Sequence, residues 1–211
     1  MFGWFRKKPP PSAVRTGADI VYADDASRAA AVVEDVQRAS AAGRRVSLLT
    51  PFRGHIPSLR ERLLQLGLPT FSLDSSYRDA EPPPDAVYLV DGGSVARWVA
   101  RLTAPQDFIQ IERHPLRSHD EAMERAIEAS STAHRLRTYL SLDDGLFTFF
   151  DQDGAIKKLM SSMDMSPREP IEHGMVTSSI EGAQAKIAKK VRTEISADTF
   201  DAWRSVNLAV R

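Results

Sequence analysis

The sequence predicts an α/β protein: a mostly parallel β-sheet with helices on both faces, followed by an all-helical extension at the C-terminus. From residue 19 to residue 143, short apolar runs alternate with longer amphipathic segments. Strands that are joined by helices pair in parallel, and a parallel sheet is buried by helices on both of its faces. After residue 143 the apolar residues recur at helical spacing.

The first strand–helix unit follows residue 18. Ile20–Tyr22 is a short strand-like run, and Asp24 or Asp25 can accept hydrogen bonds from the free amides that begin a helix. We expect this helix to run to about Ala42. Gly43 is the predicted stop, because glycine readily adopts the left-handed conformation that ends many helices.

The second unit has the same order. Val46–Thr50 is predicted to be a buried strand, and Ile56–Leu66 is an amphipathic helix whose leucines face the core. Gly67 is expected to end this helix, and Pro69–Leu73 forms the next strand. The segment that follows, Asp74–Asp85, is rich in serine, proline and aspartate and is predicted to be a loop.

The remaining elements continue the alternation and then leave it. In the sheet region we expect strand Ala86–Val90, helix Ser94–Leu102, strand Phe108–Ile111, helix Ser118–Ser130 and strand Leu136–Leu142. In the extension we expect helices at Asp144–Phe150, Ala155–Met163, Val176 to about Ile195, and about Ala197–Ala209. The chain is thus divided into a flexible tail (residues 1–17), a sheet domain (18–143) and a helical extension (144–211).

Composition excludes several classes of function. The 28 Lys and Arg residues equal the 28 Asp and Glu residues, so no net charge draws the chain to nucleic acid or to an anionic membrane. Without cysteine there is no disulfide framework, thiol nucleophile or cysteine-based zinc site. No apolar run approaches the roughly 20 residues of a membrane span, and no secretory signal follows the basic start. We therefore expect a cytoplasmic protein.

The tail combines aromatic and basic residues with a stiff linker, Pro9-Pro10-Pro11. Aromatic rings can lie at a membrane interface while cations bind the headgroups. The residues that could make such a weak peripheral contact are Phe2, Trp4, Phe5, Arg6, Lys7 and Lys8. The alternative is a tail that binds nothing.

Three blocks of the sequence carry a family resemblance. Arg45–Leu73 reads VSLLTPFRGHIPSLRERLLQLGLPTFSL from Val46, Ile111–Asp144 begins with ERH and ends with YLSLDD, and Met165–Val191 reads MSPREPIEHGMVTSSIEGAQAKIAKKV. These blocks resemble, in order and spacing, the SecA family of preprotein translocase motors, with the patterns TERHES, FYLSLEDDL and IEH–VT–I–AQ. The resemblance implies a RecA-like fold of the helicase C-terminal type, namely the family's second nucleotide-binding domain, followed by the start of its helical scaffold.

The resemblance also implies that the chemistry is degenerate. The family's Q-x-x-G-R-x-G-R element, which carries a further arginine at the second x, aligns with Ala122–Ala129. Its three arginines, which reach the ATP phosphates, align with Glu124, Ala126 and Ala129. The chain contains no G-x-x-x-x-G-K-[ST] loop and no acidic D-E-A-D pair. We expect a pseudo-ATPase rather than an enzyme, with no catalytic residue, no nucleotide-binding residue and no cofactor.

The sequence also contains features of a phosphate site and of a metal site. Gly92-Gly93 before Ser94 could receive a phosphate at a helix start, but a plain strand–helix turn fits it better. His114, His119 and His134 lie in one region of the sequence, close to Glu112 and Asp120. Their spacing lacks the H-x-x-x-H pattern of zinc hydrolases, so we predict no metal site.

The expected function is that of a non-catalytic, protein-binding or regulatory factor in preprotein translocation. Its partner would be a translocase component, a motor or a second copy of the chain, and three aromatic side chains could anchor it: Trp98, Phe200 and Trp203. Core packing is the alternative for each ring. Two other functions stay open. One is half of a split ATPase completed by a partner with a Walker motif. The other is a nucleic-acid-binding helicase relic, although the acidic residues within the basic clusters argue against it.

Overall fold

The computed structural model describes residues 14–73, 83–130, 132, 134–150 and 154–208. One sheet organises the chain, in the order β4-β5-β3-β6-β7-β2-β8, with β1 also beside β7. Its strands are β1 (Val14–Thr16), β2 (Ile20–Tyr22), β3 (Arg45–Thr50), β4 (Thr70–Leu73), β5 (Val87–Asp91), β6 (Gln106–Ile111), β7 (His134–Ser141) and β8 (Ile171–Glu172). Every pairing is parallel except that of β2 with β8. The predicted mostly parallel α/β sheet is confirmed.

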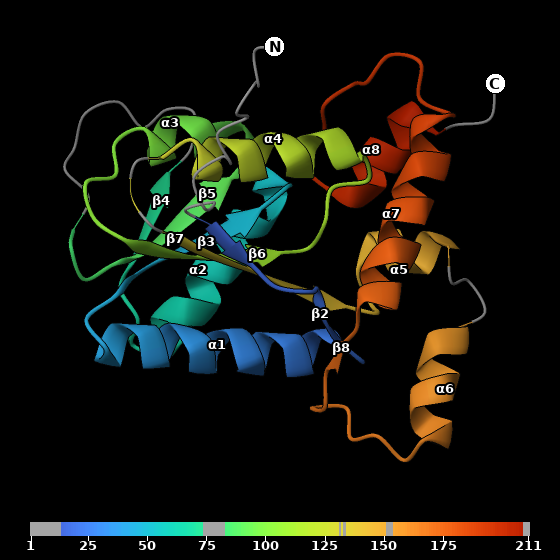
Figure 1. Ribbon diagram of the computed structural model, residues 1–211, viewed down its shortest axis with the longest axis horizontal. Coiled ribbons are helices and arrows are strands. Elements are labelled where there is room, and N and C mark those ends of the chain that lie inside the picture. The colour runs from blue at the N-terminus through green and yellow to red at the C-terminus, as the bar shows by residue number, and fades with distance from the viewer. Residues whose placement is uncertain (1–13, 74–82, 131, 133, 151–153, 209–211) are drawn as a thin grey trace, which may run out of the picture.

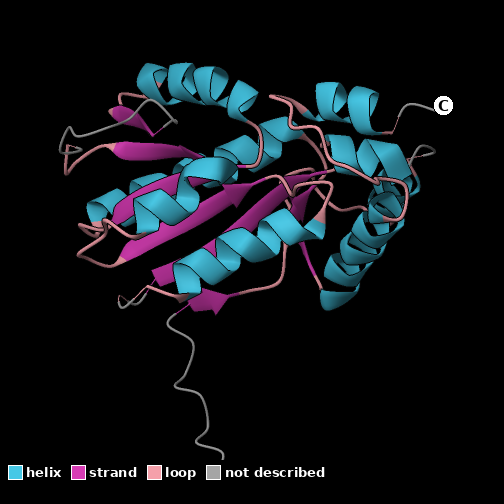
Figure 2. Ribbon diagram, turned by 90° about the horizontal axis from the view of Figure 1, so that it is seen from above, coloured by secondary structure: helices cyan, strands magenta, loops and turns pink. Residues whose placement is uncertain are grey.

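Helices cover both faces of this sheet (Figures 1 and 2). One face carries α1 (Asp25–Ala41) and α2 (Ile56–Gln65), and the other carries α3 (Val95–Val99) and α4 (Arg117–Glu128). Asp24 caps α1 by accepting a 2.7 Å hydrogen bond from the amide of Ser27. Gly43 and Gly67 have φ angles of +67° and +72°, so both glycines end their helices as predicted.

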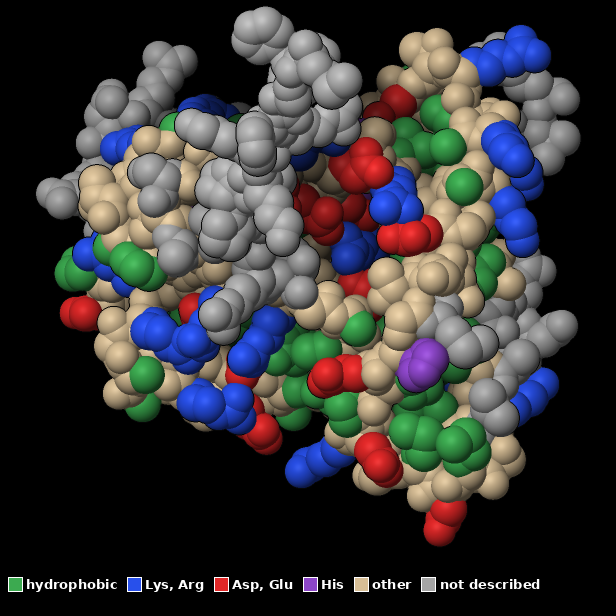
Figure 3. Space-filling view, in the orientation of Figure 1, with side chains coloured by type: hydrophobic (Ala, Val, Ile, Leu, Met, Phe, Trp, Pro, Cys, Tyr) green, Lys and Arg blue, Asp and Glu red, His purple; other side chains and the backbone are tan. Residues whose placement is uncertain are grey.

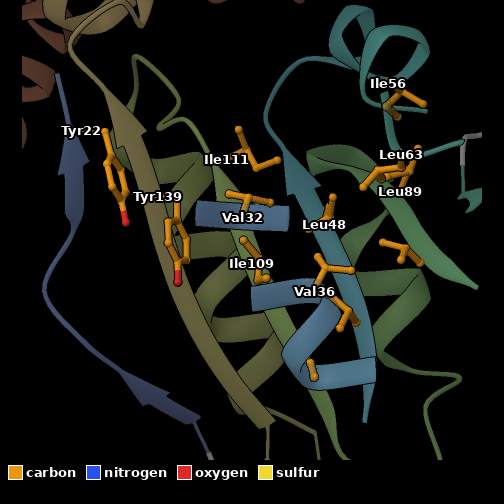
Figure 4. Close-up of a cluster of buried hydrophobic side chains, with 13 residues drawn as sticks. Tyr22, Val32, Val36, Leu48, Ile56, Leu63, Leu89, Ile109, Ile111 and Tyr139 are labelled. Atoms are coloured by element: carbon orange, nitrogen blue, oxygen red, sulfur yellow. The ribbon is translucent and has the colours of Figure 1, made fainter. Parts of the chain in front are cut away.

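Each face has its own apolar core. Beneath α1 and α2 lies the cluster in Figure 4, where the rings of Tyr22 and Tyr139 stack with centroids 6.3 Å apart. Beneath α3 and α4, Tyr88 and Trp98 pack with ring centroids 4.7 Å apart. Burial on both faces explains why β3 and β5 are buried at nearly every position instead of at alternate ones.

The C-terminal part packs around the carboxyl ends of the strands (Figure 1). It contains α5 (Gly145–Phe150), α6 (Ala155–Ser162), α7 (Gly174–Ala188) and α8 (Phe200–Asn207). These helices share a third apolar cluster with the sheet, whose buried members are Val21, Phe52, Leu140, Leu142, Leu146, Phe147, Met160, Ile180, Ile187, Phe200 and Trp203. Among the described residues, no helix is both long and apolar enough to cross a membrane.

Three expectations about elements need correction. The extension is not all-helical, because β8 joins the sheet antiparallel to β2. The expected helix from Val176 to Ile195 ends at Ala188, and the chain then turns back toward α4. Val14–Thr16, expected to lie in the flexible tail, pairs with β7 as β1.

Candidate functional site

The candidate site lies at the carboxyl ends of the parallel strands, where ligands of open α/β sheets bind. There β6 leads into Glu112, Arg113 and His114, and β7 leads toward Asp144. Glu112 adopts a left-handed backbone conformation, with φ +74°, which residues other than glycine rarely adopt. Its carboxylate lies 3.2 Å from Nδ1 of His55, whereas Arg113 pairs with residues of the α4 side.

Arg113 is matched by carboxylates from several elements. Its guanidinium donates to Asp19 at 2.7 Å and to Glu124 of α4 at 3.0 Å, and it lies 3.8 Å from Asp120. Burial alone would lower the pKa of Arg113, but the charges of Asp120 and Asp19 outweigh burial and raise it. Figure 3 shows acidic and basic side chains crowding a hollow between α4 and the C-terminal helices. The arginine at this strand end is therefore already neutralised.

Asp120 is the buried centre of this network. Its carboxylate accepts hydrogen bonds from Nε2 of Gln110 (2.9 Å), Nε2 of Gln184 (2.7 Å) and the amide of His114 (3.3 Å). Gln184 of α7 also donates to the carbonyl of His114 at 2.7 Å. Burial raises the pKa of Asp120 to about 6. His114 and Gln184, which lie in separate sequence blocks, thus meet at one carboxylate.

The positions aligned with the family's arginines have different roles here. Glu124 pairs with Arg113, Ala126 lines a small cavity of about 120 Å³, and Ala129 follows the last residue of α4. Gly92 lines the same cavity. The Ser94 hydroxyl lies 2.9 Å from an Asp91 carboxylate oxygen and does not cap α3. None of these positions places a positive charge on the cavity.

A second buried acid lies on the other face. Asp144 pairs with Arg28 of α1 and accepts a 3.0 Å hydrogen bond from the amide of Ser141. Burial raises the pKa of Asp144 to about 7, against the opposing effect of Arg28. A groove of about 380 Å³ between α1 and α2 includes Arg28 and His55 in its lining. The hydrogen bond with Glu112 raises the pKa of His55.

Beside α4, two histidines that the sequence placed in one region converge with Glu194, which the sequence did not group with them. Nε2 of His119 lies 2.7 Å from Oε2 of Glu194, and Nε2 of His114 lies 3.5 Å from Oε1 of the same carboxylate. The two imidazole rings stack with centroids 3.8 Å apart. Burial, together with His119, lowers the pKa of His114 to about 4. Glu194 also accepts a 2.9 Å hydrogen bond from Nε1 of Trp203.

The sequence missed this cluster because α7 was expected to continue through Glu194, which would have carried that side chain away from α4. His134, grouped with His114 and His119 from the sequence, is separate from them. It bonds instead to Ser130 (2.9 Å) and to the amide of Gln106 (3.2 Å).

The predicted contact residues divide into two sets. Phe2, Trp4, Phe5, Arg6, Lys7 and Lys8 lie outside the described residues. Trp98, Phe200 and Trp203 are only 5%, 5% and 0% exposed, so these rings belong to the core and are not available as surface anchors. Nε1 of Trp98 donates to Oγ of Ser47 at 2.9 Å, and Phe200 packs on Phe52.

Sequence comparison relates the chain to curated proteins named "Protein translocase subunit SecA". That of Syntrophobacter fumaroxidans is 28% identical over 184 residues, covering 81% of this chain and 22% of the relative. Those of Polynucleobacter necessarius and Ralstonia pickettii are 34% and 32% identical over 114 residues, covering 54% of this chain and 12% of each relative. The chain thus spans less than a quarter of the length of these relatives.

The other two comparisons add little. No protein-family model matches the chain. Among solved structures, "Crystal structure of the C-terminal part of Fun30 ATPase domain" aligns with a TM-score of 0.45 at 10% identity, covering 75% of this chain and 54% of that chain.

Proposed function

We propose, from the chain's sequence relationship to the SecA family, that it is a non-hydrolytic, protein-binding factor of preprotein translocation. In this proposal residues 18–143 are a RecA-like domain of the helicase C-terminal type that keeps the family's fold and has lost its chemistry. The curated relatives are named protein translocase subunits. Partner binding is the role left to such a domain once phosphoryl transfer is lost.

The observation that carries the proposal is the pairing of Glu124 with Arg113. Phosphoryl transfer needs positive charge on the γ-phosphate, and an arginine finger contributes ~10³–10⁵ in rate. Glu124 stands at the first aligned arginine position and holds Arg113 at 3.0 Å, while Asp19 holds it at 2.7 Å. A nucleotide phosphate that approached here would meet carboxylates instead of an available cation.

The packing of aromatic side chains at the carboxyl ends of the strands supports the same proposal. Phe52, two residues after the end of β3, is buried and packs edge-on against Phe200, with ring centroids 6.4 Å apart. His114, after β6, packs edge-on against Trp203 at 5.7 Å. Side chains of the C-terminal part therefore occupy space that a ligand would need at the ends of β3 and β6.

A nucleotide titration tests this proposal. We expect the purified chain to show no ATP binding by calorimetry up to millimolar nucleotide, with a SecA motor as the positive control. Micromolar ATP binding by the chain would overturn the non-hydrolytic proposal. ATP hydrolysis in a mixture of chain and motor that exceeds the hydrolysis by the motor alone would favour the split ATPase.

Partner binding needs its own experiment. Leu64 and Leu66, at the end of α2, are half-exposed large apolar side chains and offer a contact surface. We expect immobilised chain to bind a purified translocase motor, and the double variant L64E/L66E to weaken that binding at least tenfold. K186E/K189E, at exposed positions within α7 and directly after it, is the matched control. No binding by the unmodified chain would contradict this part of the proposal.

A further inference from the structure

We propose that His114, His119 and Glu194 form a binding site for a divalent transition-metal ion of the zinc class. The three residues come from three segments: the loop after β6, the first turns of α4, and the stretch between α7 and α8. One ligand atom from each residue lies within 4.8 Å of the others. The site adjoins the Arg113 network through the backbone of His114, whose amide donates to Asp120, but its three ligand side chains make no hydrogen bond or ion pair with Arg113, and it requires no role of the chain in binding proteins.

The distances suit a tetrahedral ion. Zinc–nitrogen and zinc–oxygen bonds of ~2.0–2.1 Å place neighbouring ligand atoms roughly 3.3 Å apart. The 3.5 Å between Nε2 of His114 and Oε1 of Glu194 already matches this spacing. Nε2 of His119 lies 2.7 Å from the other carboxylate oxygen, Oε2, so the carboxylate must turn to present one oxygen to both histidines or bind through both oxygens, and the 2.7 Å contact must open by roughly 0.6 Å. His119 is half-exposed, so its ring is free to make that shift.

Hydrogen bonds around the ligands determine which tautomer of His114 must form when a metal ion binds. Nδ1 of His114 lies 3.0 Å from the amide nitrogen and 3.3 Å from the carbonyl oxygen of Leu116. When the amide donates to Nδ1, the ring proton resides on Nε2 and faces Glu194. Metal binding requires the other tautomer, in which Nδ1–H donates to the Leu116 carbonyl, the usual support of a metal-bound histidine. The Glu194 carboxylate is oriented by Trp203, whose Nε1–H donates a hydrogen bond to it.

The chemistry of the ligands selects the ion. Two neutral imidazoles and one carboxylate favour zinc or a similar transition metal over magnesium or calcium, which prefer oxygen ligands throughout. His114 and His119 also line the cavity of about 120 Å³ beside Asp120, which leaves room for water as a fourth ligand. Because Glu194 precedes α8, a bound ion would tie that helix to α4.

Metal titration of the full-length chain, with any affinity tag removed and metals stripped by a chelator, tests the site. We expect Zn²⁺ to bind with one-to-one stoichiometry in calorimetry, and Co²⁺ to give the visible absorption of a tetrahedral site. Loss of an outer-shell partner alone costs 10–100-fold in metal affinity. His119→Leu and Glu194→Gln should therefore each weaken binding more than tenfold.

Glu194→Gln keeps an oxygen that accepts from Trp203, so unchanged tryptophan fluorescence would show that the variant is folded. His173→Ala, which removes a distant exposed histidine, is the matched control and should bind Zn²⁺ like the unmodified chain. Zn²⁺ should also raise the melting temperature of the unmodified chain but not of His119→Leu. The proposal is overturned if no stoichiometric binding occurs, or if both ligand variants bind as tightly as the control.

Discussion

Single residues decide the charge at the end of β6. Arg113 follows β6 at the carboxyl ends of the strands, and Asp19, Asp120 and Glu124 surround it. Asp120 in turn holds Gln110 and Gln184, so one carboxylate supports the strand end, α4 and α7. A buried network of this kind is stabilising only while every partner is present.

Asp120→Ala should therefore be severely destabilising. The substitution removes one of the two acceptors of each buried glutamine amide, the acceptor of the His114 backbone amide and one of the charges that surround Arg113. Removing one partner of a buried charge network in this way costs about 3–5 kcal/mol. Urea unfolding followed by circular dichroism measures the loss. Asp201→Ala, whose side chain is 84% exposed, should change the free energy of unfolding by less than ~0.5 kcal/mol. Equal effects of the two substitutions would contradict the network.

Asp144→Asn should change how stability depends on pH. Burial raises the pKa of Asp144 to about 7 in the folded chain, whereas a carboxyl in the unfolded chain titrates near ~3.9. Between these values the folded chain holds a proton that the unfolded chain has released. The contribution of Asp144 is therefore fully present below about pH 4 and is lost as the pH rises toward 7.

The measurement is the free energy of unfolding of both proteins at several pH values between 4 and 7. The stability of the unmodified chain, relative to that of Asp144→Asn, should fall as the pH rises across this window. The charged neighbours that act on Asp144 are Arg28, Glu112 and Asp25, and the substitution keeps all of them. Parallel stability curves would show that the carboxyl is ionised throughout.

At the scale of elements, the sequence predicted correctly those helix ends that depend on residues close to them in the chain. Asp24 capped α1, and two glycines ended α1 and α2, because hydrogen-bond geometry and backbone freedom act within a few residues. The length of α7 was predicted wrongly for the opposite reason. Its last predicted turns have helical periodicity, but the long-range bonds of Glu194 with His119 and Trp203 hold the chain in another path. No pattern near Glu194 signals those partners.

The contact between η1 (Arg53–His55) and the segment before α8 is a close backbone approach. The amide of Gly54 donates to the carbonyl of Asp198 at 2.8 Å, and a Cβ atom on Gly54 would lie 2.5 Å from that oxygen. Gly54→Ala must push the two segments apart. We expect a loss of about 1–3 kcal/mol in urea unfolding, the usual cost of overpacking.

Gly182→Ala is the matched substitution for that experiment. Gly182 lies within α7, where an added Cβ would meet nothing within 4 Å. Alanine there should stabilise the protein by about 0.5–1 kcal/mol, because it restricts the unfolded chain and favours the helix. If Gly54→Ala were as stable as Gly182→Ala, the close approach would not exist in solution.

At the scale of the whole molecule, the sequence predicted the sheet better than the site. Alternating strands and helices indicated a parallel sheet, and the strand ends carried the motif residues Glu112, Arg113 and His114. What the sequence did not show is how residues 144–208 close over those ends. Phe200 and Trp203, considered as surface anchors, are buried there, because an apolar ring is equally suited to a core and to an interface.

The three apolar clusters are joined through β7, and this predicts how the protein unfolds. Leu136 belongs to the cluster under α3 and α4, Tyr139 to the cluster under α1 and α2, and Leu140 to the cluster of the C-terminal helices. A strand shared by all three cores cannot lose one of them without weakening the others. We therefore expect one cooperative unfolding transition, even though residues 144–211 were predicted from the sequence to be a separate part.

Two tryptophans can report on this transition from opposite parts of the molecule. In a Trp4→Phe background, Trp203→Phe leaves Trp98 as the reporter of the α3 side, and Trp98→Phe leaves Trp203 as the reporter of the C-terminal helices. Each variant is followed in urea by both fluorescence and circular dichroism, and the two signals should give the same midpoint. If the Trp203 signal were lost at lower urea than the circular dichroism signal, the C-terminal part would unfold independently of the sheet. In that case the packing of Phe200 and Trp203 over the strand ends would be a reversible cover of the site.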